Sequence, residues 1–365
     1  MSMNILFFTE SGIGISALAT DQICNLKIQN DQTFGVVSSL EQEPGLIDRI
    51  RKAQIPILNL QKLEYHATPR QHIKQLREYV VTNDIDIIHV QTNWELALCY
   101  AVKLSLLGRR RVKLVYTVHA FRHNIRYKRC LALLLLNPIL CLMADRVICS
   151  CKYTRDVFPL ARYKTSLLPL GIDDGYFSDE WEYARDAHLS LIFPAQFREG
   201  KRQDMIVRAF AKYVAKSGDS DSVVILPGEG PLRDQVKQLA SSLGIGDRVI
   251  MPGHCSKAQV KELYRRVNIA VVSSNREAFG QSIVEPYVMG KVVLSTSVGI
   301  APELLDGHEG GFIFRTEDEL CEVLCHLADH PEEIERIGKG NFENRIRFSW
   351  QQITSQYLDI LRDLL

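Results

Sequence analysis

The chain has 365 residues, of which 46% are hydrophobic and 24% are charged, and its formal net charge is +1. This length suggests two domains of ordinary size, each with its own core. The composition excludes wholesale disorder, and the small net charge argues against a protein that coats nucleic acid along its whole surface.

Short apolar runs alternate with longer amphipathic stretches in the first half of the chain. Strands separated by helices of this length indicate a parallel sheet with helices on both faces. The runs expected to be strands are 4–8, 33–38, 55–58, 85–90, 113–118, 146–149 and 166–168. The stretches expected to be helices are 17–29, 69–83 and 94–107.

The loop after the first expected strand is rich in small residues. Gly12, Gly14 and Ala17 fit the G-x-G-x-x-A fingerprint of dinucleotide binding. The acid that usually ends the second strand is absent, because residues 37–39 read Val-Ser-Ser. Three interpretations stay open: an NAD site, a loop that faces a phosphate or an acceptor at a helix N-terminus, and a tight turn.

A basic and apolar segment covers residues 103–164, with 14 basic and only two acidic side chains. It contains the longest apolar stretch, 130–144, which Asn137-Pro138 interrupts. This stretch is shorter than the roughly 20 residues that span a bilayer, so we expect a buried, kinked helix. The segment suits an anionic membrane surface or an anionic substrate, and a solvated face that binds nothing has the same composition.

The alternation restarts at residue 189, so the sequence predicts two similar doubly wound α/β domains in series. The boundary should fall in 169–187, whose aromatic residues Tyr176, Phe177 and Trp181 favour packing between domains over sugar stacking. The second set of expected strands is 189–193, 223–226, 249–251, 269–272 and 292–295. The second set of expected helices is 202–216, 232–243, 256–267, 281–289 and 317–327.

Two carboxylates eight positions apart are the most informative feature of the second half. Glu277 lies in the loop after the expected strand 269–272, and Glu285 lies about one turn inside the next helix. The N–H groups near Gly280 and Gln281 could hold a phosphate between the two acids. Carboxylates accept hydroxyl hydrogen bonds, so one acid could bind sugar hydroxyls and the other a ribose diol.

Two neighbouring features refine this interpretation. Pro286 directly follows Glu285 and is expected in the first helical turn, which would keep Glu285 near the helix start. The run Asp219-Ser220-Asp221 has the form of a metal-binding Asp-x-Asp motif. Its place in a polar turn before a strand favours an acidic surface loop instead.

Glu277 and Glu285, with Phe279-Gly280 between them and Met289-Gly290-x-Val292-Val293 after them, resemble the Glu-x7-Glu signature of retaining GT-B glycosyltransferases of family 4. Further segments similar to that family are Thr117-Val118-His119, 144–150, 168–173, 299–303 and the segment beginning at Phe348. Leu170, Gln196 and Ile300 stand where the family usually has Asn, Arg and Gly.

The resemblance implies a GT-B fold, in which two Rossmann-like doubly wound parallel-sheet domains face a cleft. The acceptor-side domain would cover 1–172, with a C-terminal helix at about 348–365 packed back on it, and the nucleotide-sugar domain would cover 173–347. The implied reaction transfers a sugar from a UDP- or GDP-sugar to a hydroxyl acceptor with retention and without a metal or other cofactor. The implied setting is bacterial cell-surface polysaccharide or lipid-linked glycan synthesis.

The resemblance also implies a role for individual residues. Glu285 would hold the nucleotide ribose, and Glu277 would bind hydroxyls of the donor sugar. Lys201 and Arg198 would neutralise the diphosphate leaving group, with Arg198 replacing the arginine that the family has at Gln196. The remaining expected donor-pocket residues are His119, Phe279, Gly280, Gln281, Ser282, Gly12 and Gly14.

Location and competing functions follow from other features. Nine cysteines without a Cys-x-x-Cys pair favour reduced thiols, and residues 1–10 lack the basic region of an export signal. We therefore expect a cytoplasmic protein, with a possible place on the inner face of the plasma membrane. The alternatives are a nonhydrolysing sugar-nucleotide epimerase, which needs no acceptor, an NAD-dependent oxidoreductase that uses Gly12 and Gly14, and a catalytically silent binding module.

Overall fold

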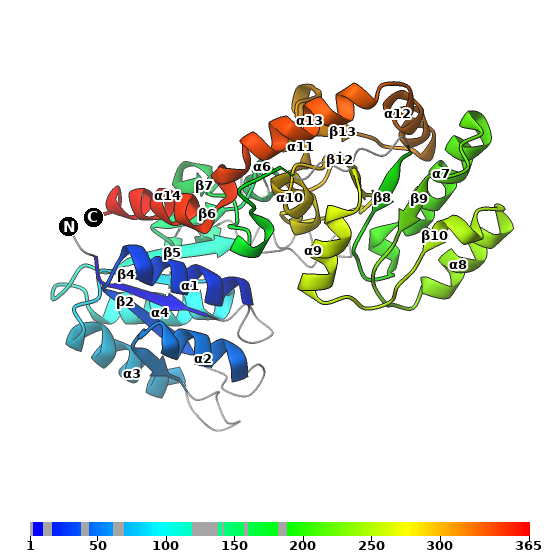
Figure 1. The fold of residues 1–365 in the computed structure, drawn as a ribbon. Helices are drawn as coiled ribbons and strands as arrows, with labels where there is room; N and C mark the ends of the chain where they lie inside the picture. The colour runs from blue at the N-terminus through cyan, green and yellow to red at the C-terminus, as the bar shows by residue number, and fades with distance from the viewer. Residues whose placement is uncertain are drawn as a thin grey trace. The chain divides into compact units, whose positions relative to one another are not determined.

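The computed structural model forms two compact units (Figure 1). One comprises Met1–Gly171 with Trp350–Leu365, and the other comprises Ile172–Ser349. These limits lie within two residues of the expected ones. The described residues are 3–9, 17–37, 44–60, 69–118, 138–140, 142–156, 160–181 and 188–365.

The first unit contains a parallel sheet of seven strands in the order β3-β2-β1-β4-β5-β6-β7. Its strands are β1 Ile5–Phe8, β2 Thr33–Val37, β3 Ile57–Asn59, β4 Ile87–Val90, β5 Lys113–Val118, β6 Arg146–Cys149 and β7 Thr165–Leu167. Its described helices are α1 Ala17–Gln29, α2 Pro44–Lys52, α3 Pro69–Thr82, α4 Asn93–Ser105, α6 Lys152–Arg155 and α14 Trp350–Arg362. All seven expected strands are present, whereas helices α2 and α6 were not predicted.

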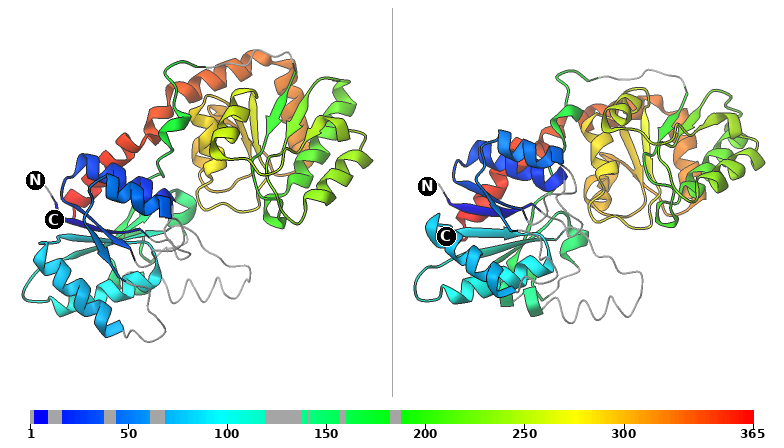
Figure 2. Two further views of the ribbon diagram at one scale, coloured as in Figure 1. Left: turned by 60° about the horizontal axis from the view of Figure 1, so that its bottom comes forward. Right: turned by 90° about the horizontal axis from the view of Figure 1, so that it is seen from below.

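Helices lie on both faces of the first sheet, as Figure 2 shows in two views. Leu6 and Phe8 of β1 join the apolar cluster that includes residues of α3 and α4. Ile5 and Phe7 join the cluster that includes residues of α1 and α14. Because side chains alternate along a strand, β1 contributes to both layers, which explains its continuous apolar run.

The second unit contains a parallel sheet of six strands in the order β10-β9-β8-β11-β12-β13. The strands are β8 Ser190–Ile192, β9 Val223–Ile225, β10 Val249–Ile250, β11 Ile269–Val272, β12 Val292–Ser295 and β13 Gly311–Ile313. The helices are α7 Gln203–Ser217, α8 Arg233–Ser242, α9 Lys257–Arg265, α10 Gln281–Val288, α11 Ala301–Leu304, α12 Glu317–Asp329 and α13 Pro331–Glu343. Strand β13 and helices α11 and α13 are additions to the expected elements. The prediction of two doubly wound α/β domains is confirmed.

The C-terminal helix α14 is part of the first unit, where it packs on α1. The Tyr357 hydroxyl of α14 lies 2.5 Å from Nδ1 of His89, and Nε2 of His89 lies 2.7 Å from Oγ1 of Thr117. All three side chains are buried. His89 therefore joins α14 to the ends of β4 and β5, where a buried polar group needs such partners.

The described helices include none that is both long and apolar enough to cross a bilayer. The kinked helix expected over 130–144 falls largely outside the described residues.

Replacing Tyr357 with Phe should lower the free energy of unfolding of the first unit by about 1–2 kcal/mol, because His89 loses a buried hydrogen-bond partner. Urea denaturation measures this change. Tyr100→Phe is the matched control, since that hydroxyl has no hydrogen bond to a described residue, and it should change stability much less. Equal losses in both variants would contradict the assigned role of the His89 contact.

Candidate functional site

The second unit brings a lysine and a glutamate together at the carboxyl end of its sheet. Nζ of Lys201 lies 2.5 Å from Oε1 of Glu277, and the Ser274 hydroxyl donates to the same oxygen at 2.7 Å. The Lys201 and Glu277 side chains are only 14% and 16% exposed. Lys201 follows β8 and Glu277 follows β11, which are neighbours in the sheet. Both residues were predicted for the site, but their direct contact was not.

Hydrogen bonds to the backbone hold these two loops together. The Ser273 hydroxyl donates to the carbonyl oxygens of Lys201 and Arg202, each at 2.8 Å. The Asn275 N–H donates to the Gly200 carbonyl at 2.9 Å. Ser273 is fully buried, so its two contacts fix the carbonyl groups of the two consecutive residues Lys201 and Arg202. The Lys201–Glu277 pair thus rests on a rigid support.

Two glycines shape the start of α10. Gly280 caps the helix with a φ of 95°, in the left-handed region that favours glycine. A Cβ on Gly299, whose φ is 53°, would lie 2.2 Å from the Phe279 carbonyl oxygen. The Ile300 N–H donates to that oxygen at 2.9 Å. The turn after β12 therefore packs closely against the loop that carries Glu277. Glycine is needed at 299 because any side chain there would collide with this loop.

The expected donor-pocket residues at this helix start differ in exposure. Gln281 is exposed and Ser282 is partly exposed, so both can meet a ligand from solvent. The Phe279 side chain is buried and contributes mainly to packing. His119, Gly12 and Gly14 lie outside the described residues, and their expected roles stay predictions.

The second expected cation, Arg198, lies on the loop after β8. This loop pairs with the glycine-rich turn after β9, since the N–H groups of Ala195 and Phe197 donate to the carbonyls of Pro227 and Glu229, each at 3.0 Å. Side chains in this extended segment alternate between its two faces as they do in a strand. Gln196 and Arg198 are therefore exposed, while Phe197 is buried. Arg198 forms no ion pair with a described residue.

Glu285 lies in α10 beside aromatic hydroxyl groups. Tyr176, Lys257, Asp173 and Tyr264 lie near enough to influence the ionisation of its carboxyl group. Burial raises the pKa of Glu285 to about 7, a shift that Asp173 increases and that Lys257 and the nearby Tyr176 hydroxyl oppose. Ionisation of Glu285 should therefore occur near neutral pH.

Three expectations about neighbouring residues need revision or refinement. Pro286 is the sixth residue of α10 and lies in its second turn, so the expected first-turn position is wrong. A helix of eight residues tolerates it because only one internal hydrogen bond is lost.

Tyr176 and Trp181 make contacts within the second unit, where Trp181 Nε1 donates to the Gly290 carbonyl at 3.3 Å. Asp219 orders its own turn by accepting from the N–H of Asp221 at 2.8 Å.

The sequence analysis did not predict several residues that lie close to Lys201, Glu277 or Glu285. These residues are Ser273, Ser274, Tyr176, Lys257 and Tyr264. The Ser-Ser pair directly after a buried strand was a usable signal, because strand ends of parallel sheets often supply ligand-binding groups. The tyrosines could not be found in this way, since they lie near Glu285 only after three separate elements have packed together.

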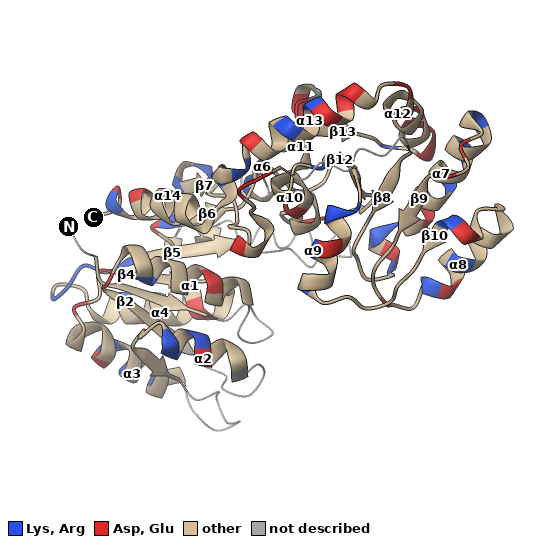
Figure 3. Cartoon of the chain, viewed as in Figure 1, with Lys and Arg blue, Asp and Glu red and all other residues tan. Residues whose placement is uncertain are grey.

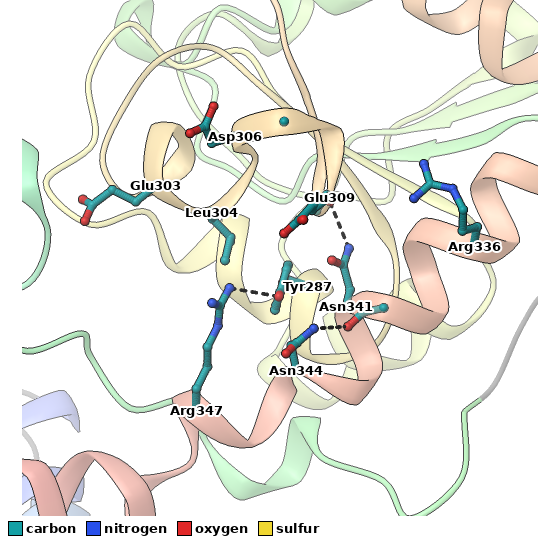
Figure 4. A pocket seen from close by; sticks show the side chains of 12 residues that line it. Tyr287, Glu303, Leu304, Asp306, Glu309, Arg336, Asn341, Asn344 and Arg347 are labelled. Atoms are coloured by element: carbon teal, nitrogen blue, oxygen red, sulfur yellow. Dashed lines mark hydrogen bonds between the residues drawn. The ribbon is translucent and has the colours of Figure 1, made fainter.

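A separate cavity of about 720 Å³ opens elsewhere in the second unit (Figure 4). It includes Gly310, directly before β13, whereas Lys201 and Glu277 follow the carboxyl ends of their strands. Arg347 donates to the Tyr287 hydroxyl at 2.9 Å in its wall. The residues that line it are Tyr287, Glu303, Leu304, Asp306, Gly307, Glu309, Gly310, Arg336, Gly340, Asn341, Asn344 and Arg347. None of the expected site residues contributes to this cavity.

Comparison with protein families assigns both halves of the chain. Residues 183–343 match the model of "Glycosyl transferases group 1", and residues 34–175 match that of "Glycosyltransferase Family 4". The two matched ranges together cover most of both units.

Curated relatives show more distant similarity. N-acetyl-alpha-D-glucosaminyl L-malate synthase of Bacillus anthracis is 30% identical over 181 residues, which cover 48% of this chain and 45% of that protein. D-inositol 3-phosphate glycosyltransferase of Saccharomonospora viridis is 28% identical over 184 residues, which cover 48% and 43%. Putative glycosyltransferase EpsD of Bacillus subtilis is 23% identical over 79% of each chain. The chain spans less than half the length of the first two relatives.

Solved structures share the fold along nearly the whole chain. HepE of Anabaena in complex with UDP has a TM-score of 0.80 at 18% identity, with 99% of this chain and 100% of that chain covered. A glycosyltransferase of Rickettsia africae has a TM-score of 0.77 at 16% identity, with 100% and 98% covered. The likeness confirms the expected GT-B fold.

Replacing Glu285 with Gln should flatten the pH dependence of stability. The pKa of this carboxyl is about 7 in the folded protein, against an ordinary value of 4.5. Between these values the folded state binds more protons than the unfolded state, so the stability present below the lower pKa is lost as pH rises through the higher one. One pKa unit corresponds to about 1.4 kcal/mol, so the loss in the wild type should be about 1–3 kcal/mol.

Urea denaturation at pH 5 and pH 7.5 tests this expectation. The wild type should lose more stability between these two pH values than Glu285→Gln does. Glu322→Gln, at an exposed position in α12, is the control and should behave like the wild type. The same pH dependence in wild type and Glu285→Gln would show that Glu285 has an ordinary pKa.

Proposed function

The chain belongs to the group 1 and family 4 glycosyltransferases with the GT-B fold, and from this premise we propose that it transfers a sugar from a nucleotide sugar to a hydroxyl acceptor with retention of configuration. The observation that carries the proposal is the Lys201–Glu277 pair at the start of α10, with Glu285 eight residues further on. This arrangement offers a cation, helix N–H groups and two carboxylates to one ligand.

The donor that we propose is a UDP-sugar, with a GDP-sugar as the second candidate. HepE of Anabaena has been solved with UDP and with UDP-glucose, which supports a uridine nucleotide. The acceptor would be a hydroxyl of a bacterial cell-surface polysaccharide or a lipid-linked glycan. No metal or cofactor takes part in the reaction that we propose.

The ligand-free ion pair suggests how the donor enters. Lys201 and Glu277 neutralise each other in a largely buried place. Either charge without a partner would be unfavourable there, because it has lost its contact with water. A diphosphate replaces the carboxylate as the partner of Lys201, and Arg198 supplies a second positive charge. Glu277 is thereby released to accept hydrogen bonds from hydroxyls of the donor sugar, while Glu285 accepts from the ribose.

Chemistry then proceeds on one face of the sugar. The bond between the anomeric carbon and the phosphate oxygen breaks, and the bond to the acceptor oxygen forms on the same side. The departing phosphate takes the proton of the acceptor hydroxyl. Lys201, Arg198 and the N–H groups near Gly280 and Gln281 stabilise the negative charge that develops on the leaving group.

Replacing Glu285 with Ala should weaken nucleoside diphosphate binding by about 10- to 150-fold, because a hydrogen bond to a charged group is worth about 1.5–3 kcal/mol. Calorimetric titration with UDP, GDP and ADP in the presence of EDTA measures this loss. Glu322→Ala is the surface control. Wild-type affinity in Glu285→Ala would refute the ribose assignment.

The same titrations separate the two acids when UDP is compared with UDP-glucose. Glu277→Ala should bind UDP as well as the wild type or more tightly, because Lys201 is freed for the diphosphate. It should lose any extra affinity that the sugar provides. A parallel loss for both ligands would place Glu277 at the nucleotide instead of the sugar.

We further propose that the first unit contacts an anionic membrane through residues 103–164. Leu107, Leu142, Leu160 and Tyr163 in this segment are large apolar residues that are mostly exposed. Basic residues occur among them in α6 and directly before β7, near the labels of these elements in Figure 3. Lys103, Arg110 and Arg155 contribute less, since each is paired with an acid inside the unit. Apolar and basic side chains together favour anionic lipid.

Vesicle flotation tests the membrane proposal. The protein should float with vesicles that contain phosphatidylglycerol at low salt and remain behind at high salt, because the attraction to anionic lipid is screened. Vesicles of phosphatidylcholine alone are the control and should bind less. Absence of binding to the anionic vesicles at low salt would remove the proposal.

A further inference from the structure

The separate cavity of the second unit has the size of a ligand pocket. Its volume is about 720 Å³, and ligand pockets usually measure about 300–1,000 Å³. Its walls come from α10, α11, the segment before β13, α13 and the 3-10 helix Arg345–Phe348, all within one unit. Lys201, Glu277 and Glu285 do not line it, so the proposed reaction does not account for it.

Two buried polar side chains in the wall have bonding capacity left for a ligand. Tyr287 is only 3% exposed, and its hydroxyl accepts from Nη2 of Arg347 at 2.9 Å, as Figure 4 shows. The same hydroxyl donates to no described residue. Asn341 is only 1% exposed, and its Nδ2 donates to the carbonyls of Lys291 and Gly310 at 2.8 and 2.9 Å. Its Oδ1 accepts from no described residue, so the wall offers one donor and one acceptor.

Helix α13 contains two glycines, and packing explains only one of them. A Cβ on Gly338 would lie 2.6 Å from the Gly290 carbonyl oxygen and 3.1 Å from the Trp181 ring. A Cβ on Gly340 would meet nothing within 4 Å. Gly340 lines the cavity, and glycine inside a helix is less favourable than alanine. The missing side chain at 340 keeps the cavity open, which gives this unfavourable residue a purpose.

Charged groups of both signs surround the two polar side chains. Asp306 and Glu309 lie before β13 and form no ion pair with a described residue. Arg347 likewise has no acidic partner among the described residues, and Arg336 contacts Glu333 only at 3.7 Å. A ligand with a single sign of charge would be repelled by some of these groups. A hydroxyl group both donates and accepts, so the lining fits a neutral ligand with many hydroxyls.

We propose that this cavity is a second glycan-binding site, which holds a neutral segment of the glycan outside the reaction site. The inference rests on the proposed function, because that function supplies the glycan. The Tyr287 hydroxyl donates to a sugar oxygen, and Asn341 Oδ1 accepts from a sugar hydroxyl. The charged groups bind further hydroxyls at the rim. A second contact of this kind raises the affinity for a long glycan above that for a short one.

The test compares the wild type with two substitutions of Gly340. Gly340→Phe fills the cavity, whereas Gly340→Ala leaves it open and is the control. Both variants should fold, because the Cβ has free space in the helix, and thermal unfolding checks this. Binding is measured by saturation-transfer difference NMR with maltohexaose, cellohexaose and chitohexaose. At least one of these should bind the wild type and Gly340→Ala, and Gly340→Phe should bind it at least about 10-fold more weakly.

A second pair of variants tests the hydrogen bond from the wall. Tyr287→Phe keeps the ring and removes the donor, so it should weaken binding of the same oligosaccharide by about 2- to 10-fold. Tyr264→Phe is the control, because that hydroxyl is buried in the same unit without a partner among the described residues and does not line the cavity. Calorimetric titration with UDP should give wild-type affinity in all four variants.

The outcomes separate the inference from the function on which it rests. Absence of saturation transfer to all three oligosaccharides in the wild type would overturn the second site, and so would undiminished binding in Gly340→Phe. Binding of inorganic phosphate but of no oligosaccharide would overturn it as well, since the cavity would then be an anion site. Failure of the wild type to bind UDP, GDP or ADP would overturn the proposed function, while oligosaccharide binding that Gly340→Phe abolishes would still support a sugar site in the cavity.

Discussion

The contact between Lys201 and Glu277 is the constraint on which the site depends. It joins two loops that are 76 residues apart in the chain and brings opposite charges into a largely buried place. Such a pair is stable only while each charge has a partner, because isolated buried charges are costly. Ser273 and Ser274 fix the geometry of the pair, so the loops are already shaped before a ligand arrives. A ligand with a diphosphate and sugar hydroxyls can replace both internal partners at once.

Sequence patterns predicted most of the fold because buried parallel strands leave a strong signal. The run Ile5–Phe8, for example, is apolar along its length since β1 is covered on both faces. Strand β13 was missed because its three residues, Gly311–Ile313, are too few to show the alternation that marks a strand. Helix α13 was missed because Gly338 and Gly340 weaken its helical pattern, although its apolar residues pack in the unit.

The sequence named the residues of the candidate site but did not predict the contacts that the structure shows among them. Glu277, Glu285 and Lys201 stood out through their spacing from strands and glycines. Their actual partners depend on strand order, since β8 lies beside β11 although they are distant in sequence. Tyr176 likewise influences the ionisation of Glu285 although it lies in a turn more than a hundred residues before that helix. No local pattern encodes such a meeting, and only the packed sheet reveals it.

The path of the chain has a consequence for how the protein is made. The second unit is continuous in sequence, whereas the first is completed by α14, which carries Trp350 and Tyr357 into its core. During synthesis, the apolar layer between the amino-terminal sheet and α14 therefore becomes fully covered only after residues 350–365 have been made. The part that emerges first from the ribosome is the last to be finished, and it stays open to chaperones while the whole second unit is translated.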